Sequence, residues 1–298
     1  YKPSAYKLFQ LNEASLRADV FSRTAASNAG SVFTLTIPNA EGMPERYKVS
    51  EHSVMDPQLA ARYPEIKSYA GQGIDEPGSV IYFDVSLSGF HGMILSAGRQ
   101  TIYIDPVDRN DQYYVVFSRS DVMSQKKFTC LTRESVNEGI FNPGTGVMQR
   151  GADDGRLRTY RLALACTGEY AQYFLNGTET TDAQRKAKVL TAMNTLMVRT
   201  NGIYERDFGI HMNLIANNDA IIYLNASTDP WTTEWNTKTQ QTIDAVIGSA
   251  NYDIGHLVHK ESSAANNNGN AGCIGCVCVN GSKGSAFTSH VAPEGDPF

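Results

Sequence analysis

Apolar residues in the first 138 positions fall into short runs separated by turn residues, a pattern typical of β-strands. Isoleucine, valine and tyrosine are enriched in these runs, as expected for strands. The predicted strands lie in Ser31–Pro38, Ser79–Leu95 (two strands around Ser88-Gly89), Gln100–Val107 and Gln112–Arg119. Asp56–Ile66 has an acidic residue, then a proline, then leucine and alanine, which predicts a helix. The first part of the chain is therefore expected to be a β-rich domain.

A change of composition divides the chain. Residues 139–156 contain five glycines and one proline among polar residues, a composition typical of a linker. Residues 1–138 are thus expected to form one domain and residues 157–298 a second.

The second part alternates between strand-like and helix-like patterns. Apolar residues at helical spacing predict a long helix from Thr181 to about Arg206, and Thr181 with Gln184 forms a capping box at its start. A shorter helix is predicted in Thr239–Ala250. Predicted strands are Arg156–Cys166, Gly209–Leu224 (one or two strands), Tyr252–His259 and Cys273–Val279. This order predicts an α+β or α/β fold, in which a mixed, mostly parallel twisted sheet packs against two long helices.

Composition and charge exclude several classes of protein. The 298-residue chain is 41% hydrophobic and 19% charged, values typical of a globular protein. Its net charge is −5, and both halves, divided at Arg150, are slightly acidic. Because binding to nucleic-acid phosphates needs clustered positive charge, no nucleic-acid partner is expected. No apolar run approaches the length of a transmembrane helix.

Three of the five cysteines form a C-x-x-C-x-C cluster at Cys273, Cys276 and Cys278, and the others are Cys130 and Cys166. Such a cluster could bind zinc or an iron–sulfur cluster, but no second C-x-x-C provides the remaining ligands. On a strand, Cys273 would also point away from the other two. Buried thiols, or a disulfide from one of them to Cys166, are the favoured interpretations.

The histidines form no recognisable metal motif. His256 and His259 would point to opposite faces of a strand, and His290 is expected in a loop, so hydrogen-bonded side chains are favoured over a three-histidine zinc site. The 298 residues contain no H-E-x-x-H, no G-x-S-x-G, no Walker loop and no G-x-G-x-x-G after a strand.

Four stretches of the second part resemble, in order, the reprolysin-like (adamalysin-type) metzincin zinc metallopeptidases, in the bacterial secreted group. They are "ACTGEYAQYF" (Ala165–Phe174), "VRTNGIYERDFGIHMNLIANNDAIIY" (Val198–Tyr223), "IGSANYDIGHLV" (Ile247–Val258) and "GNAGCIGCVCVNGSKGSAFTSHVAPEGDPF" (Gly269–Phe298). Residues 1–138 resemble the propeptide of such enzymes. The resemblance implies a secreted or cell-surface bacterial endopeptidase, a hydrolase that is made as a zymogen.

In this family, a segment ending in G-D-P-F leads into a helix with H-E-x-x-H-x-x-G-x-x-H. Its three histidines bind zinc, and its glutamate is the general base for a zinc-bound water. The resemblance therefore implies that the chain is truncated before this helix. No catalytic or metal-binding residue is expected in this chain. The full-length protein should bind zinc, whereas this fragment should bind none and be inactive.

The resemblance also implies where peptide or protein substrates bind. An extended peptide would pair with an edge strand, which the sequence places at Gly272, Cys273, Ile274, Gly275 and Cys276. Cys130, in the propeptide-like part, is a candidate latency thiol that would fill the open position of the zinc, although a structural thiol is the simpler interpretation.

Two other functions stay open. A non-catalytic binding or surface protein could keep a metzincin-like scaffold, because fold alone does not determine function. A small metal-binding protein that uses Cys273, Cys276 and Cys278 is the third hypothesis. The oligomeric state is not predicted.

Overall fold

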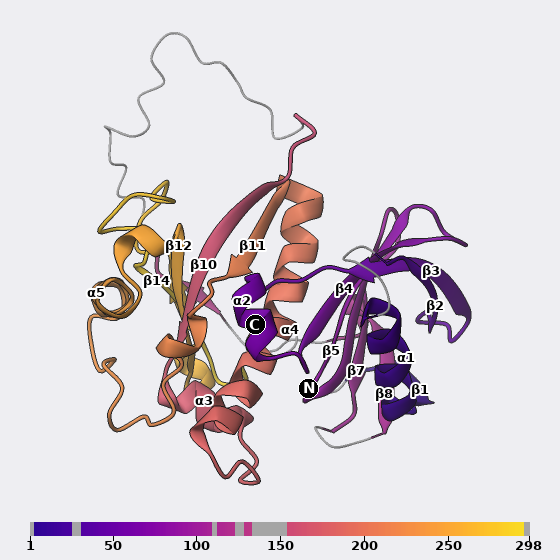
Figure 1. Cartoon of the computed structure of the whole chain (residues 1–298), viewed down its shortest axis with the longest axis horizontal. Coiled ribbons are helices and arrows are strands. Elements are labelled where there is room, and N and C mark those ends of the chain that lie inside the picture. The colour runs from indigo at the N-terminus through magenta and orange to yellow at the C-terminus, as the bar shows by residue number, and fades with distance from the viewer. Residues whose placement is uncertain (1–2, 26–30, 109–111, 123–127, 133–153, 295–298) are drawn as a thin grey trace.

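Two sheets and a long helix between them organise the chain (Figure 1). The computed structural model describes residues 3–25, 31–108, 112–122, 128–132 and 154–294. The predicted linker at 139–156 falls almost entirely outside these residues, so the boundary between the domains stays a prediction. The expected α+β class is confirmed, with a β-rich unit first and a mixed sheet with helices second.

The first sheet has eight strands in the order β1-β8-β7-β6-β5-β4-β3-β2, and every neighbouring pair is antiparallel. The strands are β1 (Lys7–Gln10), β2 (Phe33–Pro38), β3 (Pro44–Glu51), β4 (Lys67–Gly73), β5 (Ser79–Ser86), β6 (Gly89–Ser96), β7 (Ile102–Pro106) and β8 (Tyr113–Ser118). The helices of this unit are α1 (Glu13–Ala25), α2 (Pro57–Arg62) and the short 3-10 helix η1 (Arg119–Asp121). The predicted strands are confirmed, and so is α2 with Asp56 as its N-cap.

Both faces of this sheet are covered. In β5, Ile81 and Phe83 pack into a core that includes Val20 of α1, whereas Tyr82 packs into a second core on the opposite face. Successive side chains of a strand point to opposite faces, so a strand that is covered on both sides is apolar along its whole length. This burial explains why β5 shows no clear alternation of polar and apolar residues.

The second sheet has the order β11-β10-β12-β14-β13-β9. Its strands are β9 (Thr129–Cys130), β10 (Arg158–Cys166), β11 (Ile210–Leu214), β12 (Ile254–Lys260), β13 (Asn268–Asn270) and β14 (Ala286–His290). The pairs β10–β11, β10–β12 and β12–β14 are parallel, whereas β13 runs antiparallel to β14. The helices of this unit are α3 (Gly168–Phe174), α4 (Asp182–Phe208) and α5 (Trp235–Val246), with 3-10 helices η2 (Asn218–Ile221), η3 (Ser249–Asn251) and η4 (Ala264–Asn266).

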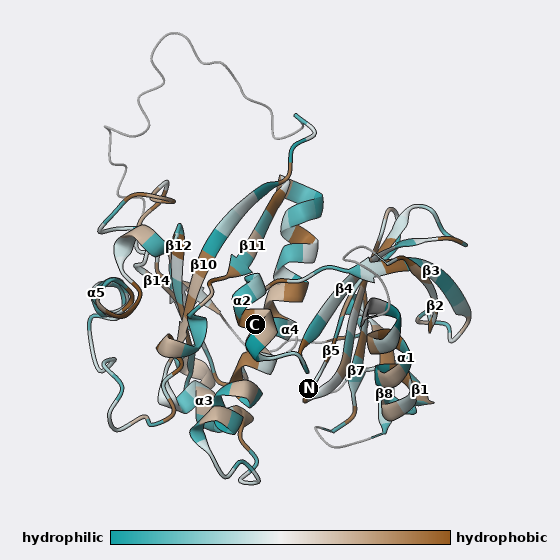
Figure 2. Ribbon diagram, in the orientation of Figure 1, coloured by the Kyte–Doolittle hydropathy of each residue, from teal (hydrophilic) through white to brown (hydrophobic). Residues whose placement is uncertain are grey.

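Helix α4 lies between the two sheets (Figure 1). Its residues Leu190, Met193 and Met197 share one apolar core with Leu164 of β10 and with Met93 of β6. Hydrophobic and hydrophilic segments alternate along the α4 ribbon in Figure 2. Apolar side chains therefore point from α4 toward both sheets. Helix α5 covers the other face of the second sheet, where Ile243 packs in a separate core.

The ends of α4 follow from its sequence. The predicted capping box is confirmed, because the Thr181 hydroxyl accepts from the Gln184 N–H and the Gln184 side chain accepts from the Thr181 N–H. The helix ends at Gly209, whose φ of 62° is in the left-handed region where glycine is favoured.

Two predictions about the second unit are wrong, and a third is narrowed. Cys273–Val279 is not a strand, because left-handed φ angles at Gly272 (70°), Gly275 (77°) and Cys278 (64°) fold it into turns. His290 is not in a loop but ends β14, a strand that the sequence analysis missed. The region Gly209–Leu224, predicted to form one or two strands, contains one strand, β11, and η2 follows it.

The first unit contacts the second through a backbone bridge, through an ion pair, and through side chains that line a shared cavity. Met55 forms a parallel bridge with Leu214 at the end of β11. Arg199 of α4 forms an ion pair with Asp105 of β7. The pair lies beside a cavity of about 610 Å³, which is lined by residues of both units. None of the helices in the described ranges has the length and apolarity needed to span a bilayer.

Candidate peptide-binding edge

The outermost strand of the second sheet comes from the first half of the chain. Strand β9 lies parallel to β13, with Thr129 opposite Asn268 and Cys130 opposite Gly269. The Thr129 N–H donates to the Asn267 carbonyl (3.0 Å), and the Leu131 N–H donates to the Gly269 carbonyl (2.8 Å). This edge of the sheet therefore holds an extended segment by strand addition, the way in which many domains hold peptides.

Side chains add to this backbone pairing. The Ala271 N–H donates to the Thr132 hydroxyl (2.8 Å), and the Asn270 side-chain amide donates to the Leu131 carbonyl (3.4 Å). A Cβ atom at Gly269 would lie 2.9 Å from the Phe128 ring and 3.1 Å from the Phe287 carbonyl. Gly269 is thus required for the close approach of Phe128.

Cys130 is an exposed free thiol on this added strand. A hydrogen bond with the Thr132 side chain, together with one to the Thr132 backbone, lowers the pKa of the Cys130 thiol. A lowered pKa raises the fraction of thiolate, which is the form that binds metals.

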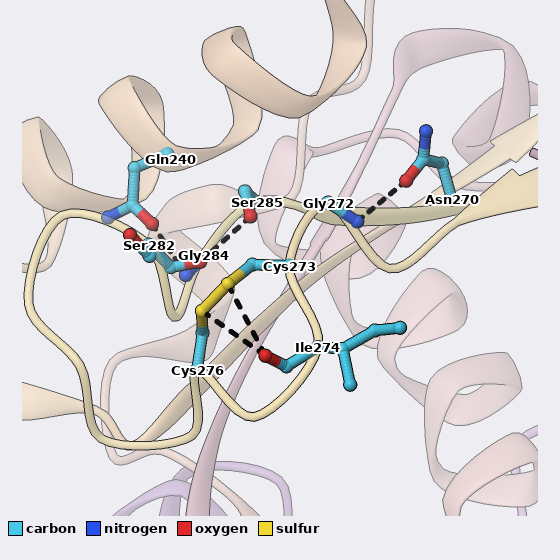
Figure 3. Close-up of a disulfide and its surroundings, with 9 residues drawn as sticks. All are labelled: Gln240, Asn270, Gly272, Cys273, Ile274, Cys276, Ser282, Gly284 and Ser285. Atoms are coloured by element: carbon cyan, nitrogen blue, oxygen red, sulfur yellow. Dashed lines mark hydrogen bonds between the residues drawn. A yellow bond between two sulfur atoms is a disulfide. The ribbon is translucent and has the colours of Figure 1, made fainter. Parts of the chain in front are cut away.

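A disulfide-closed turn follows the edge strand. Cys273 and Cys276 form a disulfide (Figure 3), and Gly272 donates its N–H to the Asn270 side-chain oxygen (2.7 Å). A Cβ atom at Gly272 would lie 2.4 Å from the Ser285 carbonyl, so this position requires glycine. The turn is therefore held close against β13 and the start of β14.

This arrangement corrects the strand conformation predicted for the substrate residues, whose role in binding stays a prediction. Gly272, Cys273, Ile274, Gly275 and Cys276 form turns next to the edge strand, and the strand itself is Asn268–Asn270. Glycines at positive φ and a disulfide between residues three apart prevent the extended conformation that pairing needs. The exposed Ile274 side chain is left beside the edge.

The thiols pair differently from the prediction. The expected disulfide to Cys166 is wrong, because Cys166 is a fully buried free thiol under α4. Burial raises the pKa of the Cys166 thiol well above its usual range, so it stays protonated. The disulfide between Cys273 and Cys276 also removes two of the three sulfurs that the metal-binding hypothesis needs.

The three histidines considered for zinc are not brought together in the described part of the chain. His256 contacts the Thr288 hydroxyl (2.9 Å), His259 contacts the Thr167 hydroxyl (2.9 Å) on the other face, and His290 contacts the Ala292 carbonyl (2.8 Å). The predicted hydrogen-bonded state of these side chains is confirmed.

His256 predicts an acid-sensitive stability. Burial lowers the pKa of His256 to about 4, below its ordinary value of 6.5. Above pH 6.5 the His256 ring is neutral in both the folded and the unfolded protein, so its burial costs no stability. As the pH falls from 6.5 to 4, the ring gains a proton only in the unfolded protein, and the free energy of unfolding therefore decreases. Between pH 6.5 and 4 we expect the free energy of unfolding of the wild type to fall by about 2 kcal/mol more than that of the variant His256→Asn. The partial exposure of the ring reduces the expected difference to this value. Urea unfolding at pH 7.5 and 4.5 measures the difference, and equal losses in both proteins would contradict the assignment.

The local sequence pattern did not predict the added strand β9. Its signal is the run "FTCLT" (Phe128–Thr132), which combines an aromatic, a β-branched and an aliphatic residue. The run is short, and its partner lies almost 140 residues later in the chain. Nothing in the local pattern identifies that partner.

Fold and edge together define the second unit as an α/β domain with an antiparallel edge strand that accepts an extended peptide segment. Residues 156–298 match the family model "Metallo-peptidase family M12B Reprolysin-like". This part of the chain is thus a reprolysin-like metzincin domain, and the resemblance to the reprolysin-like family is confirmed for these residues. No curated protein matches the chain.

The residues of this chain do not supply the zinc site that is typical of the family. The sequence has no H-E-x-x-H, and the histidines near the edge strand have other partners. One cluster of metal-ligating side chains occurs among the described residues, and it lies where the first unit meets α4 and β11.

Proposed function

We propose that this chain is the propeptide and the N-terminal part of the catalytic domain of a secreted bacterial zinc endopeptidase. The family match supports a metallopeptidase that acts on peptide bonds. The propeptide assignment is supported by the position of β9. This segment of the first unit pairs with β13 at the edge of the metallopeptidase domain.

The edge strand gives the domain a way to bind protein or peptide substrates. With β9 displaced, the Asn267 and Gly269 carbonyls would be free to accept from the N–H groups of an incoming peptide. Backbone pairing of this kind is independent of substrate sequence, and neighbouring side chains add preference. The exposed Ile274 on the adjacent turn is suited to contact an apolar substrate residue.

The zinc ligands and the general base are proposed to lie beyond Phe298, as the resemblance implies. When bound there, zinc would lower the pKa of a water molecule and polarise the peptide carbonyl. The part played by residues 1–298 is to bind and orient the peptide along β13. On this proposal the fragment alone has no peptidase activity.

Cleavage assays on a version extended beyond Phe298 test the function. The extended protein, once residues 1–138 are removed, should cleave an unfolded protein substrate; a chelator should stop cleavage, and zinc should restore it. Absence of cleavage, with retained binding of a β-strand peptide at the edge, would support the alternative of a non-catalytic binding protein. That alternative has one observation in its favour, since the peptide-binding edge is complete without any catalytic residue.

The position of β9 also predicts latency. In the extended protein, Thr129→Pro should raise basal activity about fivefold, because proline removes the N–H that donates to the Asn267 carbonyl and weakens the pairing by about 1 kcal/mol. Cys130→Ser should raise activity as well if the thiol is a zinc ligand. Cys278→Ser, which alters an exposed free thiol outside β9, is the matched control and should change nothing.

The two variants separate two forms of inhibition. Activation by Thr129→Pro alone would show that strand pairing causes latency, and it would exclude Cys130 as an inhibitory zinc ligand. Basal activity that neither variant changes would contradict the propeptide role of β9.

A further inference from the structure

Two histidines and a glutamate from distant parts of the sequence meet where the first unit contacts α4 and β11. His52 follows β3, Glu205 lies in the last turn of α4, and His211 is in β11. One ligand atom from each lies within 4.8 Å of the other two. We propose that His52, Glu205 and His211 form a binding site for a divalent transition metal ion of the zinc type.

The ring nitrogens of both histidines lie close to the same carboxylate oxygen of Glu205. His52 Nε2 lies 2.8 Å from Glu205 Oε1, and His211 Nδ1 lies 2.5 Å from the same oxygen. The two imidazole rings are 5.0 Å apart between centroids, in an edge-to-face arrangement with an interplanar angle of 68°. Small movements of these side chains would bring all three atoms to the ~2.0–2.2 Å at which zinc binds nitrogen and oxygen.

The donor set suits zinc, cobalt or nickel. Two imidazoles and one carboxylate form a three-ligand zinc set that leaves one position for water. Calcium and magnesium prefer oxygen ligands, so they fit poorly. Burial alone would raise the pKa of the Glu205 carboxyl, but hydrogen bonds with His211 and His52 lower it to about 2, and the group is a carboxylate at neutral pH.

A second layer of contacts orients the ligands. The other ring nitrogen of His211, Nε2, lies 2.9 Å from the Asn213 side-chain oxygen. The Tyr82 hydroxyl donates to Glu205 Oε2 (3.2 Å), the oxygen that the histidines do not contact. Metal-binding histidines and carboxylates usually have such partners, which hold the ring or carboxylate in place.

The backbone around the ligands is also fixed. The His52 N–H donates to the Ser68 carbonyl (2.8 Å), and the Leu214 N–H donates to the Val54 carbonyl (2.9 Å). His52 and His211 are therefore carried by segments that are tied to both sheets. Only 6% of the His211 side chain and 12% of the Glu205 side chain are exposed, whereas 32% of His52 is exposed and gives an ion access. A metal bound here would connect the first unit to the second.

Metal binding to the 298-residue chain tests the site. The chain is prepared metal-free in a Cys130→Ser/Cys278→Ser background, which removes the two exposed thiols, and titrated with Zn²⁺ and Co²⁺ by calorimetry and visible absorption. We expect one equivalent of each ion, a Co²⁺ spectrum without thiolate bands, and a higher melting temperature with zinc.

Variants assign the ligands. His52→Ala and His211→Ala should each weaken binding roughly 100-fold or more, and Tyr82→Phe roughly tenfold. His91→Gln changes a partly buried histidine of β6 outside the cluster and should leave the affinity unchanged. Should His211→Ala fail to fold, X-ray absorption on the zinc-loaded parent chain should show two imidazole ligands and no sulfur.

Three results would overturn the site. They are no binding by the parent chain, an affinity in both histidine variants equal to that of the parent chain, or sulfur among the zinc ligands. Each would leave His52, Glu205 and His211 as a hydrogen-bonded cluster only.

Discussion

The variant Asp105→Ala is expected to lower the free energy of unfolding by about 3 kcal/mol. Asp105 forms an ion pair with Arg199 of α4, and the two side chains are only 17% and 15% exposed. Removal of the carboxylate leaves the guanidinium over the Tyr103 ring without its ion-pair partner. An unpaired buried charge costs about 3–5 kcal/mol, and the adjacent cavity, which gives water some access, favours the lower end.

An exposed ion pair on the same helix provides the control. Arg206 and Asp207 are 49% and 40% exposed, so Asp207→Ala should cost less than 1 kcal/mol. Denaturant unfolding of the three proteins measures both values. A double replacement, Asp105→Leu with Arg199→Met, should recover much of the lost stability, because no buried charge then remains. A cost for Asp105→Ala as small as the control's would show that the pair contributes little to the contact between the units.

The second large effect is expected at Asn218. Beyond the end of β11, the Asn218 side chain takes the place of a strand: its oxygen accepts from the Leu164 N–H (2.9 Å), and its amide donates to the Leu164 carbonyl (3.0 Å). Asn218 is fully buried. Asn218→Ala would leave both backbone groups of Leu164 unpaired inside the protein and should cost about 3 kcal/mol.

The neighbouring Asn217 is the matched control, since it is exposed and makes no capping hydrogen bond. Asn217→Ala should change stability by less than about 0.5 kcal/mol. Thermal and urea unfolding of both variants compare the two positions. Similar stabilities for the two alanine variants would contradict the role assigned to the Asn218 side chain.

Local patterns predicted elements that depend on local interactions. The capping box at Thr181 and the acidic cap at Asp56 both satisfy N–H groups within a few residues, so the starts of α4 and α2 could be predicted. Glycine-rich turns were harder. The segment from Cys273 to Val279 has a strand-like composition, but positive φ angles and a disulfide fold it into turns.

Contacts across long sequence distances could not be predicted. β9 pairs with a strand almost 140 residues later, and His52 meets Glu205 across 153 residues. No periodicity marks either pair, because both depend on how the first unit docks onto the second. The family could be recognised from residues in order along the chain, whereas the occupied edge required the three-dimensional structure.

We propose that this chain is part of a zinc endopeptidase whose peptide-binding edge is held by its own propeptide. The most direct test is to read the coding sequence for about 20 codons past Phe298, the length of one helix with the three histidines. We predict an H-E-x-x-H-x-x-G-x-x-H segment in these codons. A stop codon, or a helix without these histidines and the glutamate, would contradict the peptidase assignment and leave a peptide-binding protein on a metzincin scaffold.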